Sequence, residues 1–267
     1  MNTLECRMVD ALKELKEKYG AISVRAEFEA EGTRLEELLR LKEICMKAGV
    51  GLTLKIGGCE SIRDMLEARI VGVNYLVAPM VESAYALRKY LQAVNKIFPL
   101  EERDNIEILC NIETVAVINE LDEIIKIPEI SLLNGIVIER VDLSLSMGMD
   151  DKSINSEKVN GAVLEIIKKI KTKNFSCTIG GGVSAQSLPF FRSLPKGYID
   201  RYETRKICFS YVNSINNDPI KGILKALGFE VLWLKNKINY YKAINMADQE
   251  RMALIEHSYL LASNSLI

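Results

Sequence analysis

The sequence predicts one (β/α)8 barrel of the TIM type, with a helix before it and a long helical extension after it. Three observations support this fold class. Short apolar runs alternate with segments of helical periodicity. Most of these runs lack the alternation of half-buried strands, as is typical of buried parallel strands. No GxGxxG motif follows the first run, which disfavours a dinucleotide-binding sheet.

The elements follow one another in a regular order along the 267 residues. A helix over residues 3–19 has apolar residues at helical spacing and ends before Gly20. The predicted strands cover residues 21–29, 52–56, 73–81, 106–112, 135–141, 175–179 and 205–209. The predicted helices between them cover residues 33–47, 60–69, 83–96, 115–125 and 156–171, with a short helical turn over 184–188. One strand of the eight is missing, so either the barrel is irregular near its N-terminus or a strand has escaped the pattern.

The C-terminal part of the chain forms a second unit in this prediction. Residues 1–218 make the barrel, and residues 219–267 make the helical extension. Apolar residues recur in the extension at intervals of three and four, and need a surface to cover them: Leu227, Val231, Leu234, Ile238 and Tyr241. That surface is either the chain's own barrel or a neighbouring subunit, and we expect a homo-oligomer.

Composition excludes several classes of function. Lys and Arg number 35 against 36 Asp and Glu, which gives no general electrostatic reason to bind nucleic acid or an acidic membrane. No apolar run has the length of a membrane helix, and residues 1–19 lack the apolar core of a signal peptide. The six cysteines show no CxxC spacing, and Cys110, Cys177 and Cys208 lie in apolar strand-like runs, so we expect these three to be buried thiols in a reducing cytoplasm. The only histidine, His257, lies in the extension, which excludes histidine-based triads in the barrel.

Charged residues and glycines gather at the predicted carboxyl ends of the strands. In such a barrel these ends and the loops after them form the active face. The candidates in chain order are Glu27, Glu29, Lys55, Glu113, Asp142, Gly180, Gly181, Gly182 and Arg205. Several carboxylates with one or two cations suit a hard divalent ion, and a glycine run exposes backbone N–H groups to an anion. The sequence therefore predicts a site for a small molecule with an oxygen-ligated metal.

Two segments carry a resemblance to a known family. They are Asn111–Ile112–Glu113–Thr114 and residues 135–144, GIVIERVDLS. Together they resemble the HpcH/HpaI aldolase and citrate lyase β-subunit superfamily. The resemblance implies an oligomeric barrel that makes or breaks carbon–carbon bonds next to the enolate of a 2-oxo acid or an acyl-CoA-like substrate. It also implies that Glu113 and Asp142 bind Mg²⁺ or Mn²⁺.

The chain departs from the family pattern at three places. The early histidine of the family's aldolases is absent, and residues 27–31, EFEAE, are similar to the acidic segment of citrate lyase β-type members. The family's substrate-binding arginine is matched by Lys55, which offers a point charge in place of a fork. Glu139 and Arg140 replace small residues before Asp142, so we expect a charge pair on the rim.

Each candidate residue has a hypothetical role. We assign Lys55 and Glu29 to catalysis, and we assign to substrate binding Glu27, Gly180, Gly181, Gly182 and Arg205. Alternatively, Lys55 pairs with Glu27 or Glu29 and only holds the rim together. Two other functions also stay open, namely a phosphotransferase or mutase of the phosphoenolpyruvate type and a catalytically idle barrel used for assembly.

Overall fold

Eight strands close into one barrel in the computed structural model, which describes residues 1–265. They follow in sequence order around the barrel. Their bounds are β1 Ala21–Glu27, β2 Gly51–Lys55, β3 Tyr75–Ala78, β4 Glu107–Ile112, β5 Gly135–Glu139, β6 Ser176–Gly180, β7 Arg201–Glu203 and β8 Ile207–Ser210. The predicted barrel fold is thus confirmed.

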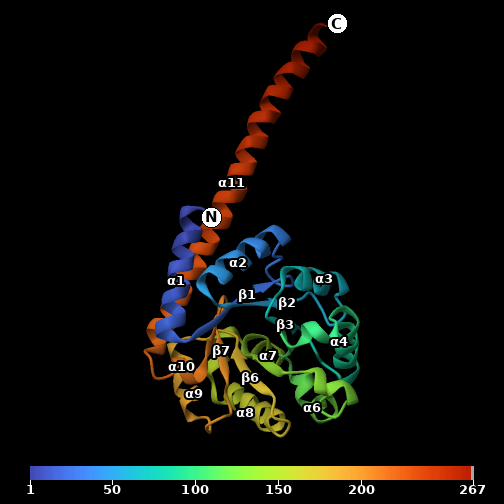
Figure 1. Ribbon diagram of the computed structural model, residues 1–267, viewed down its shortest axis with the longest axis vertical. Helices are drawn as coiled ribbons and strands as arrows, with labels where there is room; N and C mark the ends of the chain where they lie inside the picture. The colour runs from blue at the N-terminus through green and yellow to red at the C-terminus, as the bar shows by residue number, and fades with distance from the viewer. Residues whose placement is uncertain (266–267) are drawn as a thin grey trace.

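Helices surround the barrel (Figure 1). The α-helices are α1 Thr3–Tyr19, α2 Leu35–Ala48, α3 Ile62–Val71, α4 Ala84–Ile97, α5 Leu100–Arg103, α6 Val115–Ile124, α7 Arg140–Ser146, α8 Glu157–Lys171, α9 Leu188–Ser193, α10 Tyr211–Ser214 and α11 Pro219–Ser265. Three 3-10 turns are η1 Pro128–Leu132, η2 Asp151–Asn155 and η3 Ala185–Ser187. None of the described helices combines the length and the apolar character that a membrane crossing needs.

The irregular part of the barrel lies at its C-terminal end, not near its N-terminus. The strand missing from the sequence prediction is β7, and the predicted strand 205–209 is β8, Ile207–Ser210. Only residues 204–206 connect the two, which is too short for a crossover to a parallel neighbour. Accordingly, β8 pairs antiparallel with both β7 and β1, whereas the other neighbouring strands pair parallel.

Two other element boundaries differ from the prediction. The strand expected to reach Val141 ends at Glu139, and α7 begins at once with Arg140, so Asp142 lies in the first turn of a helix. The helix predicted from residue 33 begins at Leu35. Arg34 is its N-cap, and the Glu37 carboxylate accepts a hydrogen bond from the Arg34 N–H at 3.2 Å.

The interior of the barrel has a thin apolar layer beneath a polar one. Val77, Leu109 and Val137 pack together inside the barrel, separate from the larger core between the strands and the helices. Because side chains alternate along a strand, Ser23, Arg25 and Glu27 of β1 all lie on the same face. Ser23 bonds to Thr53 of β2 across 2.8 Å, and both are buried. The interior toward the carboxyl ends of the strands is therefore built from polar groups.

The cysteines inside the strands are buried, as predicted. Cys110, Cys177 and Cys208 are free thiols within β4, β6 and β8. Burial raises the pKa of Cys177 to about 12, so this thiol stays protonated at neutral pH. These side chains act as small apolar groups of the core.

Helix α11 has a half that packs on the barrel and a half that does not. Its buried residues Ile223, Ala226, Phe229 and Trp233 face the barrel, and α11 runs antiparallel to α1. Lys225 pairs with Glu14 at 2.7 Å near the start of the contact, and Asn2 bonds to Asn236 at 2.8 Å near its end. Beyond this point α11 projects away from the barrel (Figure 1). Residues 266 and 267 of the predicted extension lie outside the described residues, and its division from the barrel stays a prediction.

Gly135 and Gly161 provide a matched pair of substitutions that tests the packing of β5 on β6. A Cβ added at Gly135 would lie 2.7 Å from the Ser176 carbonyl oxygen of β6, whereas a Cβ at Gly161 in α8 meets nothing within 4 Å. We expect Gly135→Ala to lower the free energy of unfolding by about 2 kcal/mol or more. Gly161→Ala should raise it by roughly 0.5–1 kcal/mol, because alanine favours a helix interior. Urea unfolding measures both, and equal effects would contradict this packing.

Candidate active site

A buried arginine lies at the centre of the polar layer. The Arg25 guanidinium of β1 contacts three carboxylates: Glu139 Oε1 at 2.6 Å, Glu203 Oε1 at 2.8 Å and Glu27 Oε1 at 3.0 Å. All four side chains are buried and come from β1, β5 and β7. We call these four residues the Arg25 cluster. It ties three strands together across the inside of the barrel.

The charges of the Arg25 cluster depend on one another. Burial opposes the charge of the Arg25 guanidinium, but Glu203, Glu139 and Glu27 outweigh it, so the pKa of Arg25 is raised and it stays charged. Burial raises the pKa of Glu203 to about 7, Arg25 lowers it, and the neighbouring Glu139 and Glu27 raise it further. Glu203 therefore holds a proton for part of the time at neutral pH.

Lys55 and the acidic segment after β1 meet as the sequence predicted. The Lys55 Nζ lies 2.6 Å from Glu29 Oε2 and 3.9 Å from Glu27 Oε2. Burial lowers the pKa of Lys55, but Glu27 and Glu29 raise it by more, so the ammonium stays charged. The two residues assigned to catalysis are in contact. This pair is also the contact that a purely structural Lys55 would make.

Glu113 is a buried carboxylate directly after β4. It accepts hydrogen bonds from the Met80 N–H at 2.5 Å and from the Asn111 Nδ2 at 3.0 Å. Burial nevertheless raises the pKa of Glu113, and the nearby Lys55 lowers it. A carboxylate whose charge is poorly compensated is suited to accept a cation.

Asp142 is the second predicted metal ligand. Its side chain is exposed to solvent in the first turn of α7, but the surrounding protein and Glu139 raise the pKa of this carboxyl. Lys55 lowers the pKa of Asp142 as it lowers that of Glu113. The two predicted metal ligands follow the neighbouring parallel strands β4 and β5, and Lys55 ends β2, so the structure places these three residues at the carboxyl end of the barrel.

The oxygen atoms around Glu113 suit a hard divalent cation in their chemistry. Asn111 Oδ1 and Thr114 Oγ1 are buried and have no hydrogen-bond partner, and they flank Glu113 in the sequence. Within residues 1–265, no group of three or more His, Cys, Asp or Glu side chains is arranged to hold a metal ion. Two carboxylates with neutral oxygens fit Mg²⁺ or Mn²⁺ when substrate or water supplies the remaining ligands.

The expected charge pair of Glu139 and Arg140 on the rim is wrong. Glu139 points into the barrel and binds Arg25, whereas Arg140 is fully buried on the other side of β5. Arg140 donates to the carbonyl oxygens of Gly180 at 3.1 Å and Gly181 at 2.9 Å. Successive residues of an extended chain point to opposite faces, so neighbours at the end of β5 must separate.

The glycine run after β6 packs closely against the start of α7. Gly181 has φ +71°, and a Cβ there would lie 2.5 Å from the Arg140 backbone nitrogen. A Cβ at Gly180 would lie 3.0 Å from the Glu139 carboxylate, and one at Gly182 2.7 Å from Ile154. Close packing thus accounts for the glycines. Their role in binding substrate stays a prediction.

Arg205 lies apart from the other candidates. It occupies the connection between β7 and β8 and is exposed. Its guanidinium lies 3.3 Å from Glu31 and 3.8 Å from Glu230 of α11, and the neighbouring Lys206 also pairs with Glu31. Arg205 therefore connects the rim to α11, and its substrate-binding role stays a prediction.

The sequence prediction left out the central residue, Arg25. It lies in the middle of β1 and not at the end of the strand, where the predicted candidates stand. The sequence pattern that could have predicted Arg25 is the alternation of Ser23, Arg25 and Glu27, which places three polar side chains on one face of β1. A polar stripe in a buried strand indicates a polar barrel interior.

Replacing Glu203 by glutamine should change how stability depends on pH. The folded carboxyl keeps its proton up to about pH 7, compared with an ordinary value of 4.5. Between these values the folded state binds more protons than the unfolded state, so the wild type loses stability as the pH rises. Glu203→Gln cannot ionise, so it should gain roughly 1–3 kcal/mol relative to the wild type between about pH 5 and pH 8.

Urea unfolding at several pH values measures this gain. Glu250→Gln, on the exposed part of α11, controls for the change in net charge. A difference between Glu203→Gln and the wild type that stays constant across the pH range would contradict the expected titration.

Comparison with known proteins places the barrel among related folds. A structure of an HpcH/Hpal aldolase/citrate lyase family protein from Burkholderia cenocepacia J2315 has 12% identity over 85% of this chain and 98% of that chain, with a TM-score of 0.60. An HpcH/HpaI aldolase from Desulfitobacterium hafniense DCB-2 has 14% identity over 72% of this chain and 88% of its own, with a TM-score of 0.57. The citrate synthase SbnG has 14% identity over 85% and 98%, with a TM-score of 0.58. At these identities the similarity shows the fold alone.

The match to a family model is more specific. No sequence among the curated proteins matches the chain. The family segment extends from the end of α2 to β6 and contains Lys55, Glu113 and Asp142. It excludes Arg25 and Glu203. The recognition made from the sequence is therefore confirmed: residues 47–179 of this barrel match the HpcH/HpaI aldolase/citrate lyase family, whose activities are of the lyase and aldolase type.

Proposed function

We propose that this protein is a divalent-metal-dependent carbon–carbon lyase or aldolase that works through the enolate of its substrate. The substrate class is a 2-oxo acid, such as pyruvate or oxaloacetate, or an acyl-CoA-like thioester. One observation carries the proposal: Glu113 and Asp142 follow the consecutive strands β4 and β5, and Lys55 ends β2, so all three stand at the carboxyl ends of parallel strands within the segment that matches the family. A site that stabilises an enolate needs carboxylates to hold a metal ion and a positive group to compensate the negative charge of the substrate.

The carboxylates of Glu113 and Asp142 would hold Mg²⁺ or Mn²⁺. When bound, the ion would supply Lewis acidity toward the oxygen of a substrate carbonyl or enolate. The mouth of the barrel is rich in acid, which favours a bound cation. The carboxylates of this region outnumber its cations Arg25, Lys55 and Lys206, and they are Glu27, Glu29, Glu113, Glu139, Asp142 and Glu203. An anionic substrate would meet less repulsion once a divalent ion is in place.

Lys55 is the residue we assign to the negative charge of the substrate. Its ammonium would neutralise a carboxylate or enolate oxygen, which is worth most in a site with little water. Glu29 already lies 2.6 Å from Lys55, so a bound substrate must compete with it or share the ammonium. Glu29 is more exposed than Lys55 and can move aside toward solvent, where it is placed to accept a proton.

A catalytically idle barrel used for assembly is the second candidate, and one observation favours it. The buried cations in the barrel already have carboxylate partners, since Arg25 binds three and Lys55 binds Glu29. The charges of these two cations are therefore compensated without any ligand. Metal binding and enolisation of pyruvate separate the two candidates.

Metal titration tests the assignment of Glu113 and Asp142. Calorimetry with Mg²⁺ and Mn²⁺ should show binding to the wild type. We expect Glu113→Gln and Asp142→Asn each to weaken it by roughly 10-fold or more, because each removes one of two charged ligands. Asp10→Asn, on the exposed face of α1, is the control and should bind as the wild type does. Unaltered affinity in both site variants would remove the metal from the proposal.

Substitution of Lys55 tests its role in the reaction. Lys55→Met should slow metal-dependent deuterium exchange at the pyruvate methyl group by roughly 100-fold or more, because a positive group in such a site contributes a few kcal/mol. Lys55→Arg should retain exchange, because a guanidinium also binds a carboxylate well.

The same variants show whether Lys55 is only structural. In that case Lys55→Met lowers the melting temperature, because Glu29 and Glu27 lose their partner, while exchange continues at the wild-type rate. That combination would overturn the catalytic assignment and leave the metal assignment to be judged by calorimetry.

A further inference from the structure

Helix α11 presents a continuous exposed stripe of apolar residues on the side away from its buried face. The stripe, which we call the outer stripe, consists of Ile220, Leu224, Leu227, Val231, Leu234 and Ile238. Each of these side chains is 47–65% exposed, although this half of the helix packs on the barrel. The buried contact with α1 uses other residues, Ile223, Ala226, Phe229 and Trp233. The barrel therefore does not cover the outer stripe.

The spacing of the outer stripe is that of a coiled coil. Its residues follow one another at intervals of four and three without interruption from 220 to 238. In heptad notation, with a and d the positions of the seam, Leu224, Val231 and Ile238 occupy a, while Leu227 and Leu234 occupy d. Two of the three a residues, Val231 and Ile238, are β-branched, and leucine follows at d, a combination that favours two parallel helices.

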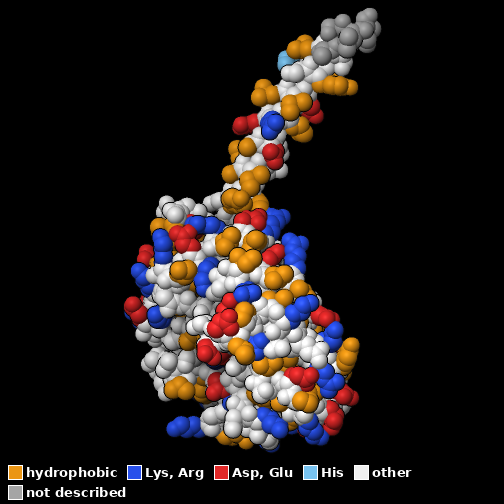
Figure 2. Space-filling view, turned by 45° about the vertical axis from the view of Figure 1, so that its right-hand side comes forward, with side chains coloured by type: hydrophobic (Ala, Val, Ile, Leu, Met, Phe, Trp, Pro, Cys, Tyr) orange, Lys and Arg blue, Asp and Glu red, His pale blue; other side chains and the backbone are white. Residues whose placement is uncertain are grey.

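The same register continues into the projecting half of α11. Tyr241 occupies the next d position, although its hydroxyl is bonded to Glu37 of α2. Asn245 and Asp248 form a polar step, and Met252, Ile255 and Tyr259 then resume the apolar seam. These last three side chains are exposed. Hydrophobic side chains are visible along the projecting helix in Figure 2. A single asparagine at an a position fixes the register and the number of strands in a coiled coil, which is the place that Asn245 occupies.

The charges that flank the stripe distinguish parallel from antiparallel pairing. In a parallel pair, each g residue faces the e residue five positions later on the other helix. This brings Glu230 to Lys235 and Arg251 to Glu256, while Lys237 meets Lys242. An antiparallel pair centred on the outer stripe would instead place Glu230 against Glu230. It would also place Lys235 near Lys221. The charge pattern favours the parallel pair.

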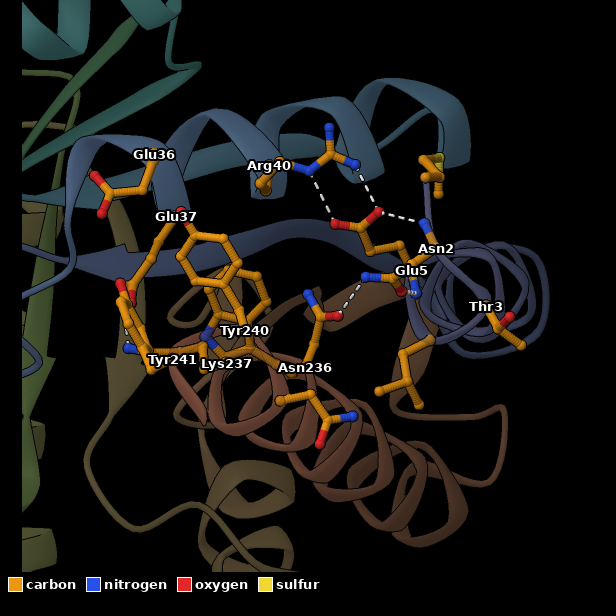
Figure 3. A pocket seen from close by; sticks show the side chains of 14 residues that line it. Asn2, Thr3, Glu5, Glu36, Glu37, Arg40, Asn236, Lys237, Tyr240 and Tyr241 are labelled. Carbon is orange, nitrogen blue, oxygen red and sulfur yellow. Dashed lines mark hydrogen bonds and ion pairs between the residues drawn. The ribbon is translucent and has the colours of Figure 1, made fainter. Parts of the chain in front are cut away.

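The start of the projecting half is held firmly in position. Figure 3 shows the corner where α1, α2 and α11 meet around a cavity of about 750 Å³. Tyr241 donates to Glu37 Oε1 at 2.7 Å, and Lys237 pairs with the same carboxylate at 3.0 Å. The direction of the helix is thus fixed before it leaves the barrel. A helix fixed in this way loses little freedom when it binds a partner.

We propose that the outer stripe and its continuation bind a second copy of this chain as a parallel two-stranded coiled coil. The features that make a second copy the matching partner all lie on α11 itself. They are the a and d residues, the polar step at Asn245 and Asp248, and the charges at e and g. Barrels on opposite sides of the pair would leave the two mouths free.

The experiment compares substitutions on and off the stripe in the full chain. Light scattering should give a mass of two 30.0 kDa chains for the wild type. The double variant Leu227→Lys with Leu234→Lys should give the mass of one chain. Met246→Lys and Leu254→Lys are matched controls, because both residues are exposed on α11 but lie outside the seam, and they should remain dimeric. A monomeric wild type, or an assembly of any size that these stripe substitutions leave intact, overturns the proposal, as does equal loss in the controls.

Cysteine crosslinking tests the direction of the pair. In a Cys6→Ser background, Ile255→Cys should form a disulfide between copies under oxidation, whereas Leu254→Cys, one residue off the seam, should not. In an antiparallel pair centred on the outer stripe the two copies of residue 255 lie far apart. Absence of the Ile255→Cys crosslink in a dimeric protein therefore overturns the parallel arrangement.

Discussion

The contact of Arg25 with three carboxylates is the interaction on which the inside of the barrel depends. A guanidinium cannot lose its charge there, so it must be compensated, and Glu27, Glu139 and Glu203 do so at 2.6–3.0 Å. In return, three carboxylates share one buried cation, which leaves the cluster short of positive charge. Burial raises the pKa of Glu203, and the neighbouring Glu139 and Glu27 raise it further, while Lys55 adds a second cation 3.9 Å from Glu27. The charge of the mouth is thus set from the centre of the barrel.

Much of the fold could be predicted, because parallel strands and their helices leave a plain pattern of apolar runs. β7 could not, since Arg201–Glu203 is three residues long and two of them are charged. Arg201 finds its partner, Glu107 of β4, only in the closed barrel at 2.8 Å. The helical start at Arg140 was missed for a similar reason: its apolar neighbours continue the pattern of β5, and the side chain is satisfied by carbonyl oxygens some 40 residues later.

The candidate site was predictable where the residues stand at strand ends. Lys55, Glu29, Glu113 and Asp142 all lie at the mouth, and Lys55 contacts or influences the other three. Arg205 shows the limit of this approach. A side chain near a strand end can point away from the barrel interior. Here Glu203 points into the barrel and binds Arg25, whereas Arg205 points outward and contacts Glu230 of α11. Contacts with a distant helix are not encoded in local spacing.

The reversal of β8 has a consequence for everything that follows it in the chain. A regular unit would leave its last strand at the mouth and send the next helix down the outside. Because β8 runs the other way, the chain emerges at the opposite end, where Ser210 bonds to the carbonyl of Gly20. Helix α11 then runs along the outside of the barrel, antiparallel to α1, and extends beyond the barrel on the side of the mouth. The short connection 204–206 thus determines that α11 leaves the molecule on the same side as the mouth of the barrel. Any surface or partner that binds the end of α11 therefore also determines the direction in which the mouth points.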